Sequence, residues 1–65
     1  MKSREEVGAI LRRLRGRKTL KEAAMDLGMA WQTLQSYENG TRTPRDNKKE
    51  RIASYYGKKI TDIFF

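Results

Sequence analysis

The sequence contains no cysteine and no histidine. Without cysteine the chain cannot form a disulfide framework or a thiolate metal site. Without histidine it lacks the commonest general base and the commonest metal ligand. Carboxylates and lysines alone leave a small domain few routes to acid–base catalysis. We therefore expect a protein that is not an enzyme and that uses no metal, cofactor or small-molecule ligand.

Long apolar runs are also missing. No stretch approaches the roughly 18–20 apolar residues that a membrane-spanning helix needs. Residues 1–6, MKSREE, lack the apolar segment of a signal peptide. We therefore expect a cytoplasmic protein with no membrane partner. A chain of 65 residues buries only about 60% of the surface that its unfolded form exposes, so we expect one small domain over residues 1–65, with modest stability.

Acidic residues are scarce compared with basic ones. Fifteen Lys and Arg against eight Asp and Glu give a formal net charge of +7, which favours binding to nucleic acid. Eight of the basic residues lie in residues 1–21, the other seven lie in residues 42–65, and none lies in residues 22–41. The cations therefore flank the middle of the chain, which contains the only Trp.

Apolar residues recur at helical spacing through almost the whole chain, and no segment alternates as a half-buried strand would. A first helix is predicted by four apolar residues three and four positions apart: Val7, Ile10, Leu11 and Leu14. Ser3 and Glu6 form a capping-box pattern at its start, and Gly16 would end it. A helical face of this kind predicts packing against other helices.

A second helix is predicted over residues 20–27. Thr19 and Glu22 repeat the capping box, and Gly28 falls where a left-handed residue ends many helices. Its inward face is small and apolar: Leu20, Ala23, Ala24 and Leu27. A third helix, about residues 30–38, begins almost without a gap.

The third helix turns Leu34 and Tyr37 toward the core and ends at Asn39-Gly40. Pro44 prevents it from continuing through the following turn. A fourth helix would be capped by one of two residues: Asp46 or Asn47. It would carry three residues inward and close at Gly57: Ile52, Ala53 and Tyr56.

A fifth short helix over residues 60–65 would be capped by Thr61. The whole pattern predicts an all-α fold, a compact bundle of five short helices. Two short helices joined by a tight turn that contains glycine are the ingredients of a helix-turn-helix, here about residues 19–38.

The segment from Thr19 to Gly40, TLKEAAMDLGMAWQTLQSYENG, followed by TRTP, resembles the lambda-repressor-like (XRE/Cro) DNA-binding family. The residues that match the family pattern are Thr19, Ala24, Leu27-Gly28, Met29, Leu34, Tyr37, Glu38-Asn39-Gly40 and Pro44. The resemblance covers roughly residues 4–64. It implies a lambda-repressor-like DNA-binding domain of phage or bacterial type.

The resemblance implies that the third helix lies in the major groove. Its exposed stripe contains the residues that match the family's base-contacting positions: Trp31, Gln32, Gln35 and Ser36. A glutamine amide can accept and donate at once, as adenine N7 and N6 require, although both glutamines would also suit a plain solvated helix face. For Trp31 three interpretations stay open, namely contact with DNA, burial in the core, and contact with a protein partner.

Phosphate contacts would supply affinity that does not depend on sequence. The resemblance puts them at the start of the second helix and in the loop after the third: Lys18, Thr19, Lys21, Asn39, Thr41, Arg42 and Arg45. Thr33 is a further candidate, for a phosphate or a base edge. Arg42 and Arg45 are the strongest candidates. We interpret the arginines of the first helix as a solvated face: Arg12, Arg13 and Arg15.

Three departures from the family pattern affect these expectations. Leu20 stands where a glutamine that helps to hold the DNA backbone is common, and Ala30 replaces the usual hydroxyl cap of the third helix. Polar residues stand in the fourth helix where apolar ones are frequent: Asp46, Lys49 and Glu50. The first departure weakens one contact, and the other two predict marginal stability without a change of fold.

We expect a sequence-specific double-stranded DNA-binding transcriptional regulator, repressor-like and of the small Cro kind. It would bind a near-palindromic operator as a homodimer, at least on DNA, with half-sites about one helical turn apart. Dimer contacts would come from the domain itself. Phe65 is the candidate dimer contact, whereas Ile63 and Phe64 are expected in the core.

Two alternatives remain at this stage. The same fold could serve as an antitoxin-like or adaptor module that binds a protein; such an interface would tolerate Gln32→Ala and fail with Trp31→Ala. Single-stranded RNA is a weaker alternative, because it would require several stacking aromatic residues beside a basic groove.

Overall fold

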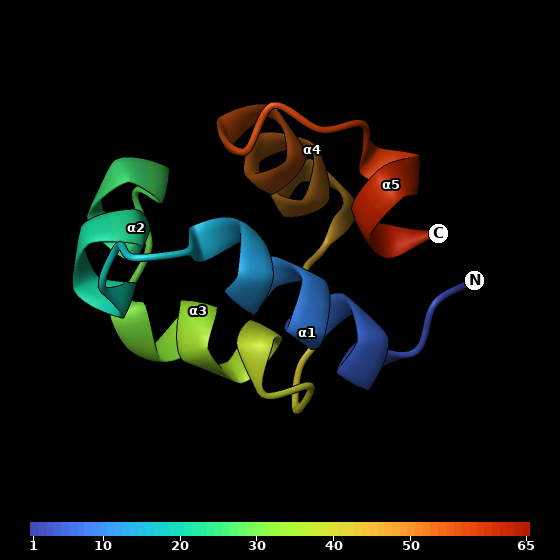
Figure 1. Ribbon diagram of the computed structural model, residues 1–65, viewed down its shortest axis with the longest axis horizontal. Coiled ribbons are helices and arrows are strands. Elements are labelled where there is room, and N and C mark those ends of the chain that lie inside the picture. The colour runs from blue at the N-terminus through green and yellow to red at the C-terminus, as the bar shows by residue number, and fades with distance from the viewer.

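The computed structural model describes all of residues 1–65 and is entirely helical. It contains five α-helices: α1 (Arg4–Arg15), α2 (Leu20–Leu27), α3 (Trp31–Glu38), α4 (Asp46–Tyr55) and α5 (Ile60–Phe64). In Figure 1, α1 runs through the middle of the molecule, α3 lies along one side of it, and α4 with α5 covers the other. The predicted all-α bundle of five short helices is therefore confirmed.

Capping boxes begin α1 and α2, as the sequence predicts. The Ser3 hydroxyl accepts the Glu6 amide at 3.1 Å, and the Glu6 carboxylate accepts the Ser3 amide at 3.0 Å. Thr19 and Glu22 repeat the pair of bonds at 3.1 and 2.9 Å. Gly28 ends α2 in the left-handed conformation, with φ 69°. These local signals depend only on neighbouring residues, which is why sequence locates them.

The predicted cap of α4 is wrong. Arg45 is the N-cap and has an extended backbone, so Asp46 is already the first helical residue and Asn47 the second. No side chain caps this helix. At the other end, α4 stops at Tyr55, and Tyr56 packs half-buried against the core as predicted. Burial raises the pKa of Tyr56 to about 12, because its hydroxyl is buried without a hydrogen-bond partner.

The predicted cap of α5 is also wrong. Thr61 lies inside the helix, and Lys59 is the N-cap. The amide of Lys59 donates to the Asp62 carboxylate at 3.2 Å. An acid at the third helical position can reach back to the cap amide, so the acidic half of a capping box stabilises this start without the hydroxyl half.

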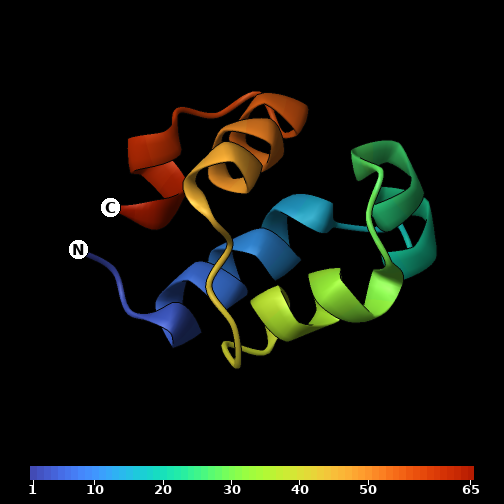
Figure 2. The ribbon, with the colours of Figure 1, turned by 180° about the vertical axis from the view of Figure 1, so that it is seen from behind.

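The core draws on all five helices. Its buried apolar residues are Val7, Leu11, Ala23, Ala24, Leu27, Leu34, Tyr37, Ile52, Ala53, Ile63 and Phe64. Leu34 and Tyr37 are buried as predicted, and so are Ile63 and Phe64. The two chain termini lie close together (Figures 1 and 2). None of the five helices is long and apolar enough to span a lipid bilayer.

A glycine lets α1 and α3 approach each other closely. A Cβ atom at Gly8 would lie 2.8 Å from the carbonyl carbon of Glu38 and 3.0 Å from the carbonyl oxygen of Tyr37. Real side chains do not approach backbone that closely, so any larger residue would push the C-terminal end of α3 away from α1. Gly8 therefore helps to set the position of α3 on the bundle.

Candidate nucleic-acid interface

One face of α3 is free of contacts with the core. Leu34 and Tyr37 occupy the inward face. The predicted base-contacting residues share the other side, three of them exposed and the last half-buried: Trp31, Gln32, Gln35 and Ser36. Thr33 is also half-buried. The helical phase predicted from the sequence is therefore confirmed, although base contact by these residues stays a prediction.

Trp31 lies at the surface, at the first residue of α3. It is 36% exposed and does not belong to the core cluster. Of the three interpretations open from the sequence, burial in the core is therefore excluded. Trp31 lines an open, mostly apolar groove together with Met25 and Met29, between the surfaces of α2 and α3. Contact with DNA and contact with protein both remain compatible with this position.

Ser36 is the most constrained of the four candidate base contacts. Its hydroxyl donates to the Thr33 carbonyl at 2.6 Å. Its own carbonyl accepts the Thr41 amide at 3.0 Å and the Arg42 amide at 3.3 Å. These bonds turn the chain back on the end of α3. A base contact by Ser36 would therefore compete with a hydrogen bond inside the helix, whereas neither Gln32 nor Gln35 forms a side-chain bond within the protein.

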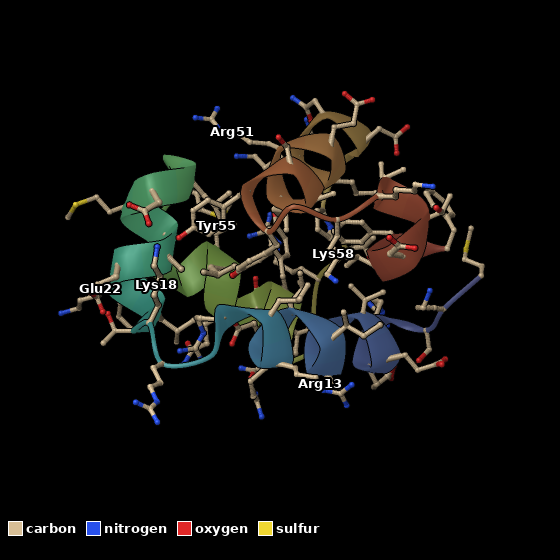
Figure 3. The ribbon with its side chains drawn as sticks, turned by 45° about the horizontal axis from the view of Figure 1, so that its top comes forward. Arg13, Lys18, Glu22, Arg51, Tyr55 and Lys58 are labelled. Atoms are coloured by element: carbon tan, nitrogen blue, oxygen red, sulfur yellow. The ribbon has the colours of Figure 1, made fainter.

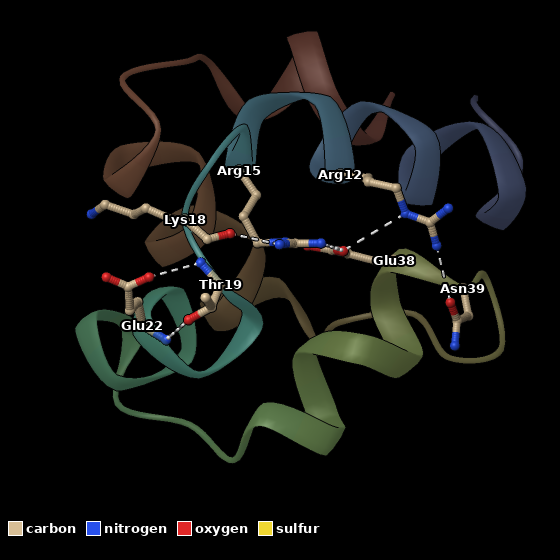
Figure 4. Close-up of polar contacts among 7 residues, drawn as sticks. All are labelled: Arg12, Arg15, Lys18, Thr19, Glu22, Glu38 and Asn39. Atoms are coloured by element: carbon tan, nitrogen blue, oxygen red, sulfur yellow. Dashed lines mark hydrogen bonds and ion pairs between the residues drawn. The ribbon is translucent and has the colours of Figure 1, made fainter.

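A buried ion pair fastens the end of α3 to α1 (Figure 4). Glu38 is only 5% exposed. Arg15 donates to its two carboxylate oxygens, from Nε at 2.8 Å and from Nη2 at 3.0 Å. Arg12 Nε lies 3.9 Å from the same carboxylate, and Arg12 Nη2 donates to the Asn39 side-chain oxygen at 3.2 Å. The hydrogen bonds that Arg15 donates to Glu38 raise the pKa of the Arg15 guanidinium.

This ion pair corrects one expectation from the sequence. Arg15 is not a solvated residue, because the close crossing of α1 and α3 brings Glu38 onto its guanidinium. Arg12 is mostly exposed but pairs with the same carboxylate, and Arg13 is exposed as predicted. The sequence does carry a signal that Glu38 is buried, though not which residue pairs with it, because Glu38 lies four residues after Leu34 on the inward stripe of α3. A carboxylate on an apolar stripe requires a buried cation nearby.

A second polar cluster joins the turn before α2 to α4 (Figure 3). Lys18 Nζ donates to the Asp26 carboxylate at 2.8 Å and to the Tyr55 hydroxyl at 2.7 Å. The Tyr55 hydroxyl donates to the same Asp26 oxygen at 2.6 Å. Hydrogen bonds from Lys18 and Tyr55 lower the pKa of Asp26. A phosphate contact by Lys18 would therefore have to share or break this cluster.

The loop after α3 separates the two strongest phosphate candidates. Thr41 and Arg42 stay against the end of α3, because their amides bond to Ser36. The loop then crosses α1 to reach the other side of the molecule (Figures 1 and 2). Arg45 therefore lies at the start of α4. Neither Arg42 nor Arg45 belongs to any of the four ion pairs of the protein.

A comparison with known protein families identifies the kind of domain that the chain forms. A protein-family model described as a helix-turn-helix domain matches residues 6–59. The chain belongs to this helix-turn-helix family. No curated protein and no solved structure matches the chain significantly. The family agrees with the resemblance to lambda-repressor-like proteins, and a helix-turn-helix domain suggests DNA binding.

Part of the predicted phosphate set lies around α3. Lys21 is exposed at the groove beside Trp31 and Gln32 and has no carboxylate partner. At the other end of α3, Asn39 and Thr41 lie beside Arg42, although Arg12 already donates to Asn39. Thr19 is exposed, but its hydroxyl caps α2. Lys21 therefore lies near the start of α3, and the backbone of Thr41 and Arg42 lies at its end. Contact of the predicted residues with phosphate stays a prediction.

The start of α3 lacks a side-chain cap, as the sequence predicts. Ala30 is the N-cap and forms no side-chain hydrogen bond. A helix start carries amides without internal partners and a partial positive charge. The start of α3 can therefore attract an anion, although residues 22–41 contain no basic side chain.

Proposed function

We propose that this protein is a sequence-specific regulator of transcription that binds double-stranded DNA, acts as a repressor, and reads the major groove with α3. One observation carries the proposal. The only two glutamines of the chain, Gln32 and Gln35, lie on the exposed face of a helix whose opposite face is fixed to the core. Each has an amide that can pair with both adenine N7 and N6.

Two groups of residues would divide the work of binding. Trp31, Gln32 and Gln35 would contact base edges, since they are the most exposed residues of α3. Lys21 would hold the DNA backbone on one side of α3, and Arg42 would hold it on the other. Phosphate contacts position a protein on DNA without reading sequence, and base contacts specify the site. This division accounts for a reading helix with no cation inside a protein of net charge +7.

A single α3 reads only a few base pairs, so the proposal includes a homodimer on a near-palindromic operator. Phe65 is the candidate dimer contact because it is 44% exposed. The ammonium of Lys49 lies over its ring, 4.9 Å from the centroid, and leaves the rest of the ring open to a partner. Such a regulator would act in the cytoplasm of a bacterium or of a phage-infected cell.

Selection of bound sites from random duplex DNA tests the proposal. We expect enrichment of a short half-site repeated in inverted orientation, with centres about 10 base pairs apart. Lys58→Ala is a suitable control, because this exposed lysine follows α4 on the side of α1 away from α3 (Figures 1 and 3). It should enrich the same sequence. A pool that shows no enrichment with the wild-type protein would contradict sequence-specific DNA binding.

The alternative of an antitoxin-like or adaptor protein keeps one supporting observation. Met25 is 80% exposed and Trp31 is 36% exposed beside it, and exposed apolar surface often marks a protein contact. If a protein partner used this surface, Trp31→Ala would abolish its binding and Gln32→Ala would not. If the protein instead reads DNA, Gln32→Ala should reduce its preference for the operator over other DNA.

A further inference from the structure

The apolar groove between α2 and α3 continues the exposed face of α3. Met25 comes from α2, Met29 from the turn, and Trp31 from the start of α3. Gln32 lines the same groove, so its apolar surface reaches one of the candidate adenine-reading side chains. The groove and the candidate reading face therefore form one continuous surface.

The rim of this groove has the charge that suits a polyanion. Lys21 is the only charged residue that lines it, and no carboxylate does. Lys21 takes part in no ion pair of the protein. A DNA backbone could therefore approach the groove without bringing its phosphates against an acidic side chain.

The major groove of DNA offers one prominent apolar group. Base edges there carry mainly hydrogen-bond donors and acceptors, and the C5-methyl group of thymine is the largest apolar group among them. If α3 lies in the major groove, this methyl group is the base-specific contact that best suits the apolar surface beside Gln32. A flexible, polarisable methionine and a flat indole are well suited to enclose a methyl group.

We propose that the groove formed by Met25, Met29 and Trp31 recognises the C5-methyl group of a thymine, next to the base pair read by Gln32. The inference rests on the proposed function, since it assigns a base to a further part of the same surface. It makes Met25, a residue of α2, a determinant of sequence preference. The operator then requires a T·A pair beside an A·T pair in each half-site.

Replacing thymine by uracil in the operator tests this directly, because the exchange removes only the C5-methyl group. For the wild-type protein we expect about fourfold weaker binding per half-site at one thymine position, as for one buried methyl-sized group. Symmetric replacement in both half-sites should weaken binding by about 15-fold. All other thymine positions should tolerate the exchange within about twofold.

The protein side of the same test uses three variants. Trp31→Ala and Met25→Ala should bind thymine and uracil operators almost equally, since neither retains the full groove. Met25 is 80% exposed, so Met25→Ala should match the wild-type protein in thermal unfolding, and both variants should keep its circular dichroism spectrum. Lys58→Ala, at an exposed residue outside the groove, should keep the full preference for thymine.

The possible failures can be distinguished. If an operator is selected but no thymine-to-uracil exchange weakens binding, methyl recognition is wrong while sequence-specific binding stands. The inference is equally overturned if Trp31→Ala keeps the full preference for thymine. It is also overturned if neither Trp31→Ala nor Met25→Ala changes operator binding and the groove instead binds a protein. If no operator is selected at all, the proposed function fails and this inference fails with it.

Discussion

At the scale of single residues, Gln32 and Glu38 have opposite roles on the same short helix. Gln32 is exposed with no bond to the protein, and Glu38 is buried with two strong bonds from Arg15. A buried carboxylate without its cation is costly. Glu38 therefore stabilises the placement of α3, whereas Gln32 is free to contact a ligand.

Removing the buried carboxylate should destabilise the protein strongly. Glu38→Ala leaves the guanidinium of Arg15, whose side chain is only 18% exposed, without its partner. Breaking such a pair costs about 3 kcal/mol or more. Urea denaturation should show this loss in the free energy of unfolding. The matched control is Glu50→Ala, at an exposed glutamate outside every ion pair, which should change it by about 0.5 kcal/mol or less.

An unfolding free energy for Glu38→Ala within about 1 kcal/mol of the wild-type value would contradict this account. It would mean that the fixed position of α3 depends on the apolar contacts and on the close crossing at Gly8, not on the ion pair.

At the scale of elements, α3 is held firmly at its end and weakly at its start. Its C-terminal residues pack against Gly8 and pair with Arg15. Its first residue follows Ala30, which forms no capping hydrogen bond. α1 and α2 instead have complete capping boxes. The start of α3, like that of α4, is therefore an element boundary at which a capping side chain can add stability.

Ala30→Ser should stabilise the protein. The backbone at Ala30 is already extended, as an N-cap requires, so a serine hydroxyl can accept an amide of the first turn without rearrangement. The gain is about 1 kcal/mol. In a domain of this size it should raise the thermal midpoint by about 4–8 °C. Ala9→Ser, in the exposed interior of α1, should instead lower it slightly. Equal thermal midpoints for the two variants would show that the missing cap at Ala30 does not limit the stability of the protein.

The elements also show what the sequence can predict. The capping boxes at Ser3 and Thr19 and the inward residues of α3 were predictable, because each depends on residues within one or two helical turns. The start of α4 was not, since no capping side chain marks it. The partner of Glu38 was not predictable either, because Arg15 lies 23 residues away and meets it only through the crossing of two helices.

The candidate site divides in the same way. The phase of the exposed face of α3 was predictable from helical spacing, and the surface position of Trp31 needed the structure. The structure also supplied the groove that Met25 shares with Trp31, since its residues come from two helices and the turn between them. The loop path that leaves Arg42 beside α3 and Arg45 at α4 has no local sequence signal.

At the scale of the whole molecule, most basic residues lie in other parts of the sequence than the proposed base-reading residues. The net charge of +7 comes from cations on both sides of a segment that has none. Because phosphate binding releases counterions, each neutralised phosphate should make the affinity depend on salt in a measurable way. The separation therefore predicts that affinity and selectivity can be changed independently.

Arg42→Ala should weaken binding to every DNA sequence by a similar factor. If a dimer neutralises about eight phosphates, the slope of log K against log salt is about −7, and losing one contact per protomer reduces it by about 2. Fluorescence anisotropy at several salt concentrations measures both quantities. Lys58→Ala, on the far side of α1 from α3, should leave the slope unchanged. If Arg42→Ala and Lys58→Ala gave the same slope of log K against log salt, Arg42 would not contact a phosphate.

The central claim is that α3 reads bases, and the most direct measurement is the ratio of affinities for a selected operator and for random duplex DNA. Gln32→Ala changes an exposed side chain without a bond to the protein, so folding should be unaffected. We predict that the ratio falls by about 5- to 150-fold for each half-site, the range for one lost bidentate base contact. Binding to random DNA should change by less than about twofold, because phosphate contacts supply it. An unchanged ratio in Gln32→Ala and in Gln35→Ala would contradict the claim.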